Sequence, residues 1–262
     1  MDCIKYLNSY DEIESLVNEV AYRRIYNPAM QEHFRGQGRP EYELIPTVAR
    51  GLPDVETIRD KETKLLKAFQ DEIIRKQIPE VLRIDERLTE KQNVWNILFQ
   101  AQHFGIHTRL LDWSLKWQVG LWFAVENFKN DDVDGQFWIL SVPNEIHCNH
   151  DRNSYFQKDI SNLDRTYFVN APIYMSDELP KQVAEVKRQR QQGKFTISPY
   201  RSSFAPLDQQ ADIAPFLEKY CIPAIIKGQL RLELTARGIH KEFLYYREHN
   251  QDILDGVIKS IK

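Results

Sequence analysis

The sequence contains little cysteine and no long apolar run. Its three cysteines, Cys3, Cys148 and Cys221, lie far apart and form no Cys-x-x-Cys motif. This spacing disfavours a disulfide framework and a zinc site built on thiolates. The N-terminus is acidic where a signal peptide is basic and then apolar, and no apolar run reaches the ~18 residues that span a bilayer. We therefore expect a cytoplasmic protein with no membrane partner.

An excess of positive charge is also missing. The chain has 35 Lys and Arg against 38 Asp and Glu, for a formal charge of −3. General nucleic-acid binding requires a basic face that neutralises phosphates, and this composition does not supply one, although a local basic groove is compatible with it. The run Lys187-Arg188-Gln189-Arg190 is more typical of a solvated helix face than of a nucleic-acid patch.

The common motifs of nucleotide-binding, hydrolase and zinc-protease sites are missing as well. The sequence has no Gly-x-Gly-x-x-Gly, Walker-type loop, Gly-x-Ser-x-Gly or His-Glu-x-x-His. His147 and His150 are three residues apart near Cys148, but they fall in a segment rich in Asn and Asp, not on a rigid element. We therefore expect no metal.

The length and patterning of the chain favour one mixed domain. With 262 residues and 42% hydrophobic content, it can bury a substantial core, and it shows no internal repeat. A single domain over 1–262 is predicted, with an N-terminal helical segment over 1–32 and a C-terminal helix over 240–262. Helical spacing also predicts helices over 54–77, 85–103, 117–128 and 228–237. Alternation and apolar runs predict strands at 33–36, 135–142, 193–197 and 223–226, with a further extended piece over 42–48.

Two segments place polar groups inside apolar sequence, at 33–37 and at 102–114. Arg35 stands between Phe34 and Gly36 at the predicted end of a strand, so its guanidinium suits a phosphate or a carboxylate. The alternative is a buried structural ion pair with one of the acids.

The second segment brings four polar side chains within ten residues: His103, Thr108, Arg109 and Asp112. Arg109 and Asp112 have the spacing for a charge pair that fixes the loop. A buried polar network is costly unless every member is bonded, so this segment is either a fully bonded brace or a ligand site.

The same residues resemble the FRG domain family, named for its Phe-Arg-Gly. The similarity rests on Phe34-Arg35-Gly36-Gln37, Leu44-Ile45-Pro46-Thr47 with Arg50, Gln102-His103-Phe104-Gly105 and Thr108 to Ser114. It continues through 120–124 and Gln191 to Phe195, so it extends from about residue 10 to 240. His107 stands where the family usually has proline. The family implies a role in bacterial and phage conflict systems.

A weaker similarity links the chain to ADP-ribosyltransferases of the Arg-Ser-Glu type. It implies an α+β domain in which helices surround a split, mostly antiparallel sheet with a pocket for NAD. Arg35 would hold the NAD phosphates, Gly36 would expose backbone groups to the nicotinamide, and Ser114 or Thr108 would donate a hydrogen bond. Phe104 and Trp113 would stack on a ring of the ligand. The full set of expected NAD contacts is Arg35, Gly36, Gln37, Phe104, Thr108, Arg109, Asp112, Trp113 and Ser114.

The catalytic residues that this similarity implies are Arg35, Ser114 and Gln192. Gln192 takes the place of the family's glutamate, and a neutral amide does not stabilise an oxocarbenium-like centre as a carboxylate does. The acids that could take the place of that glutamate in space are Glu126, Glu185, Glu233 and Glu242.

The expected function is NAD-dependent transfer of ADP-ribose to a macromolecule, or NAD hydrolysis, in a toxin or defence setting. One alternative is a non-catalytic module that binds a nucleotide or another ligand and acts through a partner. A second is a nucleic-acid-processing enzyme with Arg35, His103 and Asp112 around a phosphate.

Overall fold

The fold is known from a computed structural model, which describes residues 5–26, 30–77, 89–143, 158–169, 193–244 and 250–261. These residues form one α+β domain with a six-stranded antiparallel sheet, so the predicted fold class is confirmed at this level. Seven α-helices accompany the sheet in the described part of the chain. None of the helices in these ranges is long and apolar enough to cross a membrane.

The sheet consists of two halves joined at a single point. Its strand order is β4-β5-β2-β1-β3-β6. The strands are β1 (Met30–Gln37), β2 (Leu110–Ser114), β3 (Gly135–Pro143), β4 (Tyr167–Val169), β5 (Gly193–Ile197) and β6 (Leu217–Ile222). β1 pairs with β3 along its whole length, but its pairing with β2 is limited to Phe34 opposite Ser114. Each half therefore has three strands, and the segment with Arg35 lies beside the junction.

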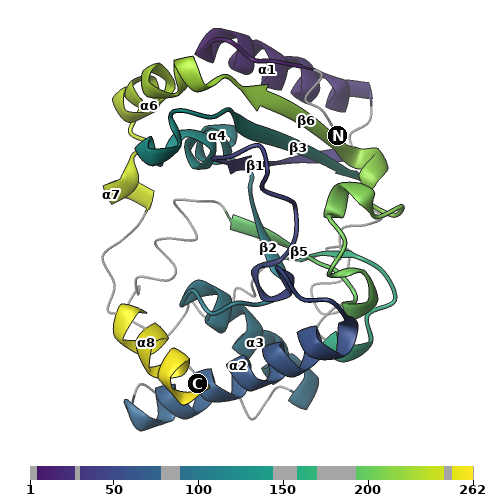
Figure 1. The fold of residues 1–262 in the computed structure, drawn as a ribbon. Helices are drawn as coiled ribbons and strands as arrows, with labels where there is room; N and C mark the ends of the chain where they lie inside the picture. The colour runs from purple at the N-terminus through teal and green to yellow at the C-terminus, as the bar shows by residue number, and fades with distance from the viewer. Residues whose placement is uncertain are drawn as a thin grey trace.

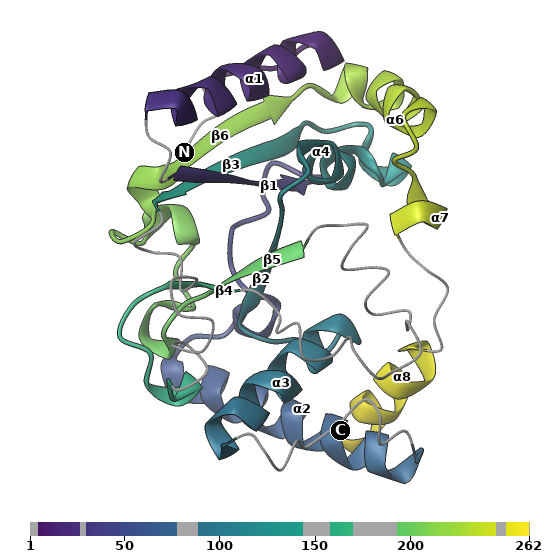
Figure 2. The ribbon, with the colours of Figure 1, turned by 180° about the vertical axis from the view of Figure 1, so that it is seen from behind.

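The helices gather at opposite ends of the molecule (Figures 1 and 2). α1 (Tyr10–Tyr26), α4 (Trp117–Val125) and α6 (Lys227–Ala236) lie near β1, β3 and β6, with the short α7 (Lys241–Leu244) beside them. α2 (Val55–Arg75), α3 (Glu90–His103) and α8 (Asn250–Ser260) lie at the other end, beyond β2 and β5. Each half of the sheet thus has its own set of helices.

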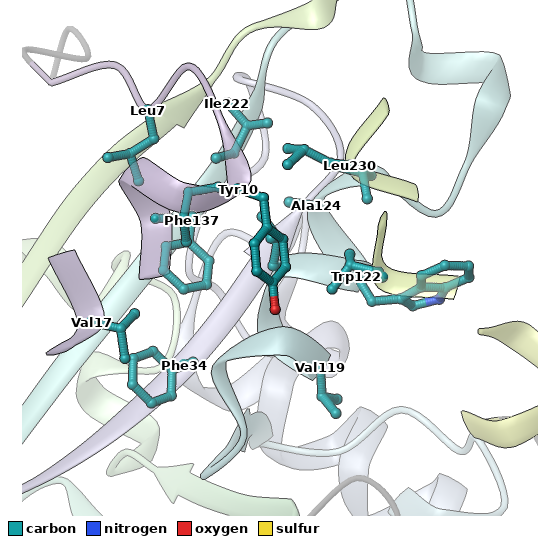
Figure 3. Packing of buried hydrophobic residues seen from close by; sticks show 14 of the residues in the cluster. Leu7, Tyr10, Val17, Phe34, Val119, Trp122, Ala124, Phe137, Ile222 and Leu230 are labelled. Carbon is teal, nitrogen blue, oxygen red and sulfur yellow. The ribbon is translucent and has the colours of Figure 1, made fainter. Parts of the chain in front are cut away.

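The largest core lies between β1, β3 and β6 and the helices α1, α4 and α6 (Figure 3). Tyr10, Phe34 and Phe137 are all buried there, and the rings of Phe34 and Phe137 stack with centroids 5.9 Å apart. α4 lies directly on β1, because glycines face each other at the contact. A Cβ on Gly36 would overlap the carbonyl oxygen of Gly120, and a Cβ on Gly120 would lie 2.8 Å from that of Phe34.

Two helices begin at polar side chains that accept hydrogen bonds from the first backbone N–H groups of the helix. At α1, the backbone N–H of Glu12 donates to the Ser9 hydroxyl at 3.1 Å, as a capping box requires. The carboxylate of Glu12 accepts from the N–H of Asn8, one residue earlier than in the standard box. At α2, Asp54 accepts from the N–H of Thr57 at 2.8 Å. These caps fix where the amphipathic helices begin.

Three predicted elements differ from the structure. The strand expected at 223–226 ends earlier, at Ile222, and Ala224–Ile226 form a 3-10 turn. Pro223 has no N–H for the ladder, and the next N–H, of Ala224, donates to Asp134 instead. The extended piece over 42–48 is a loop with a 3-10 turn at Thr47–Ala49. The final helix is two helices, α7 and α8.

The spacing of the cysteines disfavoured a disulfide framework and did not predict the one disulfide seen, at Cys221. This cysteine is disulfide-bonded, and both other cysteines lie outside the described residues. Residues 5–7 run alongside it: Leu7 donates its N–H to the Cys221 carbonyl, and Cys221 donates to the Lys5 carbonyl, each at 2.9 Å. Spacing along the chain did not predict the bond because disulfide partners are chosen by proximity in the fold. The cysteines therefore no longer support the expected cytoplasmic location.

Candidate functional site

Arg35 lies on β1 beside the junction of the two half-sheets. It is half-buried, and its Nη1 donates to the main-chain carbonyl of Asp112 at 2.6 Å. Its Nε is inaccessible to solvent and has no hydrogen-bond partner. Arg35 makes no ion pair with a carboxylate of the described residues, so the structural ion pair that was the alternative is not seen there. A guanidinium in this state has donors and charge available for an anion.

A chain of hydrogen bonds holds the Asp112 side of the site. The Asp112 carboxylate accepts from Gln102 Nε2 at 2.9 Å, and Gln102 Oε1 accepts from the Thr108 hydroxyl at 2.6 Å. The main-chain carbonyl of Thr108 accepts from the N–H of Val48 at 3.4 Å. The segment before β2 is thereby tied to the end of α3 and to the 3-10 turn over Thr47–Ala49. Thr108 is part of this brace, and Asp112 stays exposed beside Arg35.

One carboxylate, Asp112, and one further arginine, Arg50, act on the charge of Arg35. Burial lowers the pKa of Arg35 to about 10, the charge of Asp112 opposes that change, and the charge of Arg50 adds to it. Desolvation together with the charges of Lys61 and Arg50 lowers the pKa of His107. Arg50 acts on both groups, which places the positive charges of this surface near one another. At neutral pH this surface is electrostatically suited to an anion.

Arg109 is a structural residue with a different partner from the one expected. It is fully buried and pairs with the fully buried Glu62, with Nε and Oε2 2.7 Å apart, and not with Asp112. Its Nη1 and Nη2 donate to the carbonyls of Ser198 and Ile160 at 3.2 and 2.7 Å. The guanidinium also lies 3.4 Å from the ring centroid of Tyr200, whose hydroxyl donates to Glu62 at 2.7 Å. With these donors engaged, Arg109 connects β2 to α2 and to the segment after β5.

Gly36 and Gln37 have structural roles next to Arg35. Gly36 is needed for the close approach of α4 described above. The Gln37 amide donates to the carbonyl of Glu43 and accepts from the Trp138 indole, each at 3.1 Å. Both residues are buried and hold the strand that presents Arg35.

The two aromatic residues expected to stack on a ligand pack in cores. Trp113 is 3% exposed, and its indole donates to Thr196 at 3.1 Å. Phe104 packs against the cluster of α2 and α8, with its ring 5.5 Å from that of Phe69. Ser114 is also buried, and its hydroxyl accepts the N–H of Lys116 at 2.9 Å in the turn that leads into α4. The polar surface of the site therefore rests on Arg35 and Asp112.

The three elements of the Arg-Ser-Glu comparison form one row across the sheet. Phe34 pairs with Ser114, and Ser114 pairs with Gly193 at the start of β5. Gln192 and Glu185 lie outside the described residues. The other candidate acids have their own partners: Glu126 accepts from Trp122, Glu233 from Gln229, and Glu242 pairs with His240. Among the described carboxylates, the one whose charge acts on Arg35 is that of Asp112.

Sequence reasoning missed two participants. Glu62 is the buried partner of Arg109, yet it sits in a charged helix with no local mark that separates it from its exposed neighbours. Arg50 belongs to the residues that resemble the FRG family, but the sequence predicted no function for it. Among the described residues, no group of three His, Cys, Asp or Glu could hold a metal ion, and His147 and His150 lie outside those residues.

Fold and site together describe an α+β domain with a half-buried arginine, Arg35, at the junction of two half-sheets. Residues 31–133 match the FRG domain family, which confirms the resemblance seen in the sequence. The match covers less than half of the chain, and Gln191 to Phe195 lie outside it. No curated protein and no solved structure matches the chain. The similarity to ADP-ribosyltransferases stays a prediction.

Proposed function

We propose that the protein binds NAD with its pyrophosphate at Arg35 and uses it for ADP-ribose transfer to a macromolecule or for NAD hydrolysis. The observation that carries the proposal is the state of Arg35. It is half-buried, fixed by one main-chain carbonyl, and lacks a carboxylate partner among the described residues. A desolvated guanidinium with unused donors favours a phosphate, because charge-assisted bonds to it replace the lost water.

The row formed by Phe34, Ser114 and Gly193 supports NAD over other phosphates. It sets side by side the three elements that the Arg-Ser-Glu comparison requires, in the same order along the chain. In such a reaction the bond between nicotinamide and ribose C1′ breaks, and nicotinamide leaves with the bonding electrons. A nucleophile of the target, or water, then bonds to C1′ and loses a proton. A nearby carboxylate stabilises the positive charge that develops on the ribose.

Asp112 is the carboxylate that we assign to this role. It is exposed, lies on β2 beside Arg35, and is oriented by Gln102. Asp112→Asn keeps the shape and the hydrogen bond from Gln102, so we expect NAD to bind at least as well while nicotinamide release falls about 100-fold or more. Liquid chromatography of released nicotinamide measures this. Unchanged turnover in this variant would remove Asp112 from the reaction.

The binding step is tested by calorimetric titration of the full chain with NAD. Arg35→Gln should weaken binding about tenfold or more, since a hydrogen bond to a charged group contributes about 1.5–3 kcal/mol. Arg201→Gln is the matched control, because Arg201 is also an arginine that donates to a main-chain carbonyl, that of Asp164, but it lies in another segment. If NAD gives no heat and no thermal shift with the unaltered protein, the cofactor proposal fails.

A non-catalytic binding module is the second candidate. It is favoured by the pairing of Glu126, Glu233 and Glu242 with residues other than Arg35. If NAD binds through Arg35 but mass spectrometry finds neither free nicotinamide nor a modified protein or nucleic acid, this second function replaces the first.

A further inference from the structure

Arg50 carries a second guanidinium group, whose charge acts on that of Arg35, and the proposed function does not yet use it. It follows the 3-10 turn over Thr47–Ala49 and is exposed. Its Nε donates to the main-chain carbonyl of Ile45 at 3.1 Å, which fixes the direction of the side chain. Within the described part of the chain Arg50 makes no ion pair, so both of its terminal nitrogens can donate to a ligand.

Hydrogen bonds connect the two arginines through the frame of the site. Arg35 donates to the carbonyl of Asp112, and Gln102 joins the Asp112 carboxylate to Thr108. The carbonyl of Thr108 accepts from Val48, which is two residues before Arg50. One connected network of hydrogen bonds therefore fixes the backbone segments that carry Arg35 and Arg50.

Neither Arg35 nor Arg50 makes an ion pair with a described carboxylate, and one side-chain donor of each bonds to a main-chain carbonyl. Arg35, Arg50 and Lys61 carry positive charge. The charges of Lys61 and Arg50 both act on the imidazole of His107. Asp112 is the carboxylate that acts on Arg35. Lys61 and Arg50 make no ion pair with a described residue. Like charges held together in this way repel one another, and a bound anion relieves the repulsion.

We propose that Arg35 and Arg50 together bind a dianion of the phosphate class, such as a pyrophosphate diester with one phosphate at each guanidinium, and that binding is coupled to protonation of His107. The inference rests on the proposed function in its choice of a pyrophosphate. The dianion site itself is defined by the two arginines and holds for simpler anions.

The direction of the proton coupling follows from the neighbours of His107. Lys61 on α2 and Arg50 after the 3-10 turn disfavour its charged form, as desolvation does, and lower its pKa. An anion at Arg50 offsets that positive charge and favours imidazolium. The complex therefore takes up a proton, and affinity increases as the pH falls.

The test uses two probes whose charge is constant between pH 5.5 and 8, inorganic sulfate and ADP-ribose. The affinity of the full-length protein for each is measured by calorimetry at both pH values, with chloride at matched ionic strength as the reference. We expect binding about fivefold tighter at pH 5.5, the effect of one added charge near the ligand in water. In parallel, the imidazole proton signals of His107 should titrate at higher pH when sulfate is present.

Variants separate the two parts of the inference. Arg50→Gln should weaken both probes about tenfold, Arg50→Lys should weaken them less, and Arg201→Gln should have no effect. His107→Asn should keep binding at pH 8 and abolish the pH dependence. Circular dichroism verifies folding, and Arg50→Lys replaces Arg50→Gln if the latter does not fold. Equal affinities in the Arg50 variants and the Arg201 control overturn the site, and a pH dependence that survives His107→Asn overturns the coupling.

The outcomes also distinguish this inference from the proposed function. If sulfate binds with the expected dependence on Arg50 while NAD and ADP-ribose do not bind, the NAD proposal fails and the dianion site stands. If NAD binds through Arg35 and Arg50→Gln has no effect on it or on sulfate, the dianion site fails and the NAD proposal stands.

Discussion

Two arginines in similar sequence surroundings have opposite environments in the fold. Arg35 and Arg109 each stand in a short polar segment between apolar residues, and both were expected to contact a ligand. Arg109 is fully buried with a carboxylate, two carbonyls and an aromatic ring as partners. Arg35 has one carbonyl partner and an unpartnered Nε. The two arginines differ in the groups that the rest of the fold places opposite each side chain. Arg109 is therefore a structural residue, and Arg35 is a candidate binding residue.

The buried pair of Arg109 and Glu62 predicts a large loss of stability when one partner is removed. Glu62→Gln leaves a buried guanidinium without its counter-charge, so we expect a loss of about 3–5 kcal/mol in the free energy of unfolding. Urea denaturation measures it. The control is Glu19→Gln in the exposed pair with Arg23, which should cost less than about 1 kcal/mol. Similar losses in the two variants would contradict a structural role for Glu62.

At the scale of elements, periodic spacing predicted most helices and the strands with long apolar runs. α2 (Val55–Arg75) lies within the helix predicted over 54–77, and β3 and β5 fall where they were expected. β4, with only Tyr167–Val169, is too short to show alternation in the sequence. For the candidate site, the sequence located the segment around Arg35, since its arginine between Phe and Gly is unusual. It did not locate the partner of Arg109, because Glu62 is 47 residues away and only tertiary contacts select it.

The contact between α4 and β1 predicts that Gly36 tolerates no side chain. Gly36→Ala inserts a methyl group where Gly120 and Ala124 already lie, so we expect a loss of about 1–3 kcal/mol in stability. Gly193→Ala on β5 is the control, because a Cβ there meets no atom of the described residues within 4 Å. The change at Gly193 should be neutral or stabilise by up to about 1 kcal/mol. Chemical denaturation measures the free energy of unfolding of both variants. An unchanged free energy in Gly36→Ala would contradict the close packing.

At the scale of the whole molecule, the candidate site joins the two half-sheets. The pair of Phe34 and Ser114 and the bond from Arg35 to Asp112 both cross the junction. On one side the core of α1, α4 and α6 fixes β1, and on the other the network around Arg109 fixes β2. Arg35 therefore comes from one half of the sheet and Asp112 from the other. This arrangement requires long-range packing of both halves, which explains why local sequence patterns indicated the residues but not their geometry.

The disulfide at Cys221 acts on the stability of the whole chain, because a cross-link restricts the unfolded ensemble. Cys221 lies on β6 and is paired with the segment over 5–7. Cys221→Ser should lower the free energy of unfolding by about 2–4 kcal/mol, which corresponds to a melting temperature about 5 to 12 °C lower. Dithiothreitol should produce a similar decrease in the unaltered protein and none in the variant.

Thiol titration in denaturant provides the independent measurement of that cross-link. With three cysteines in the chain and one disulfide that includes Cys221, the oxidised protein should show one free thiol, and the reduced protein three. Three free thiols without reductant, together with a melting temperature that dithiothreitol does not change, would contradict the disulfide and restore the reduced state that the spacing of the cysteines suggests. One free thiol together with a reductant-sensitive melting temperature would confirm it, and would show that folding brings together cysteines that the sequence keeps far apart.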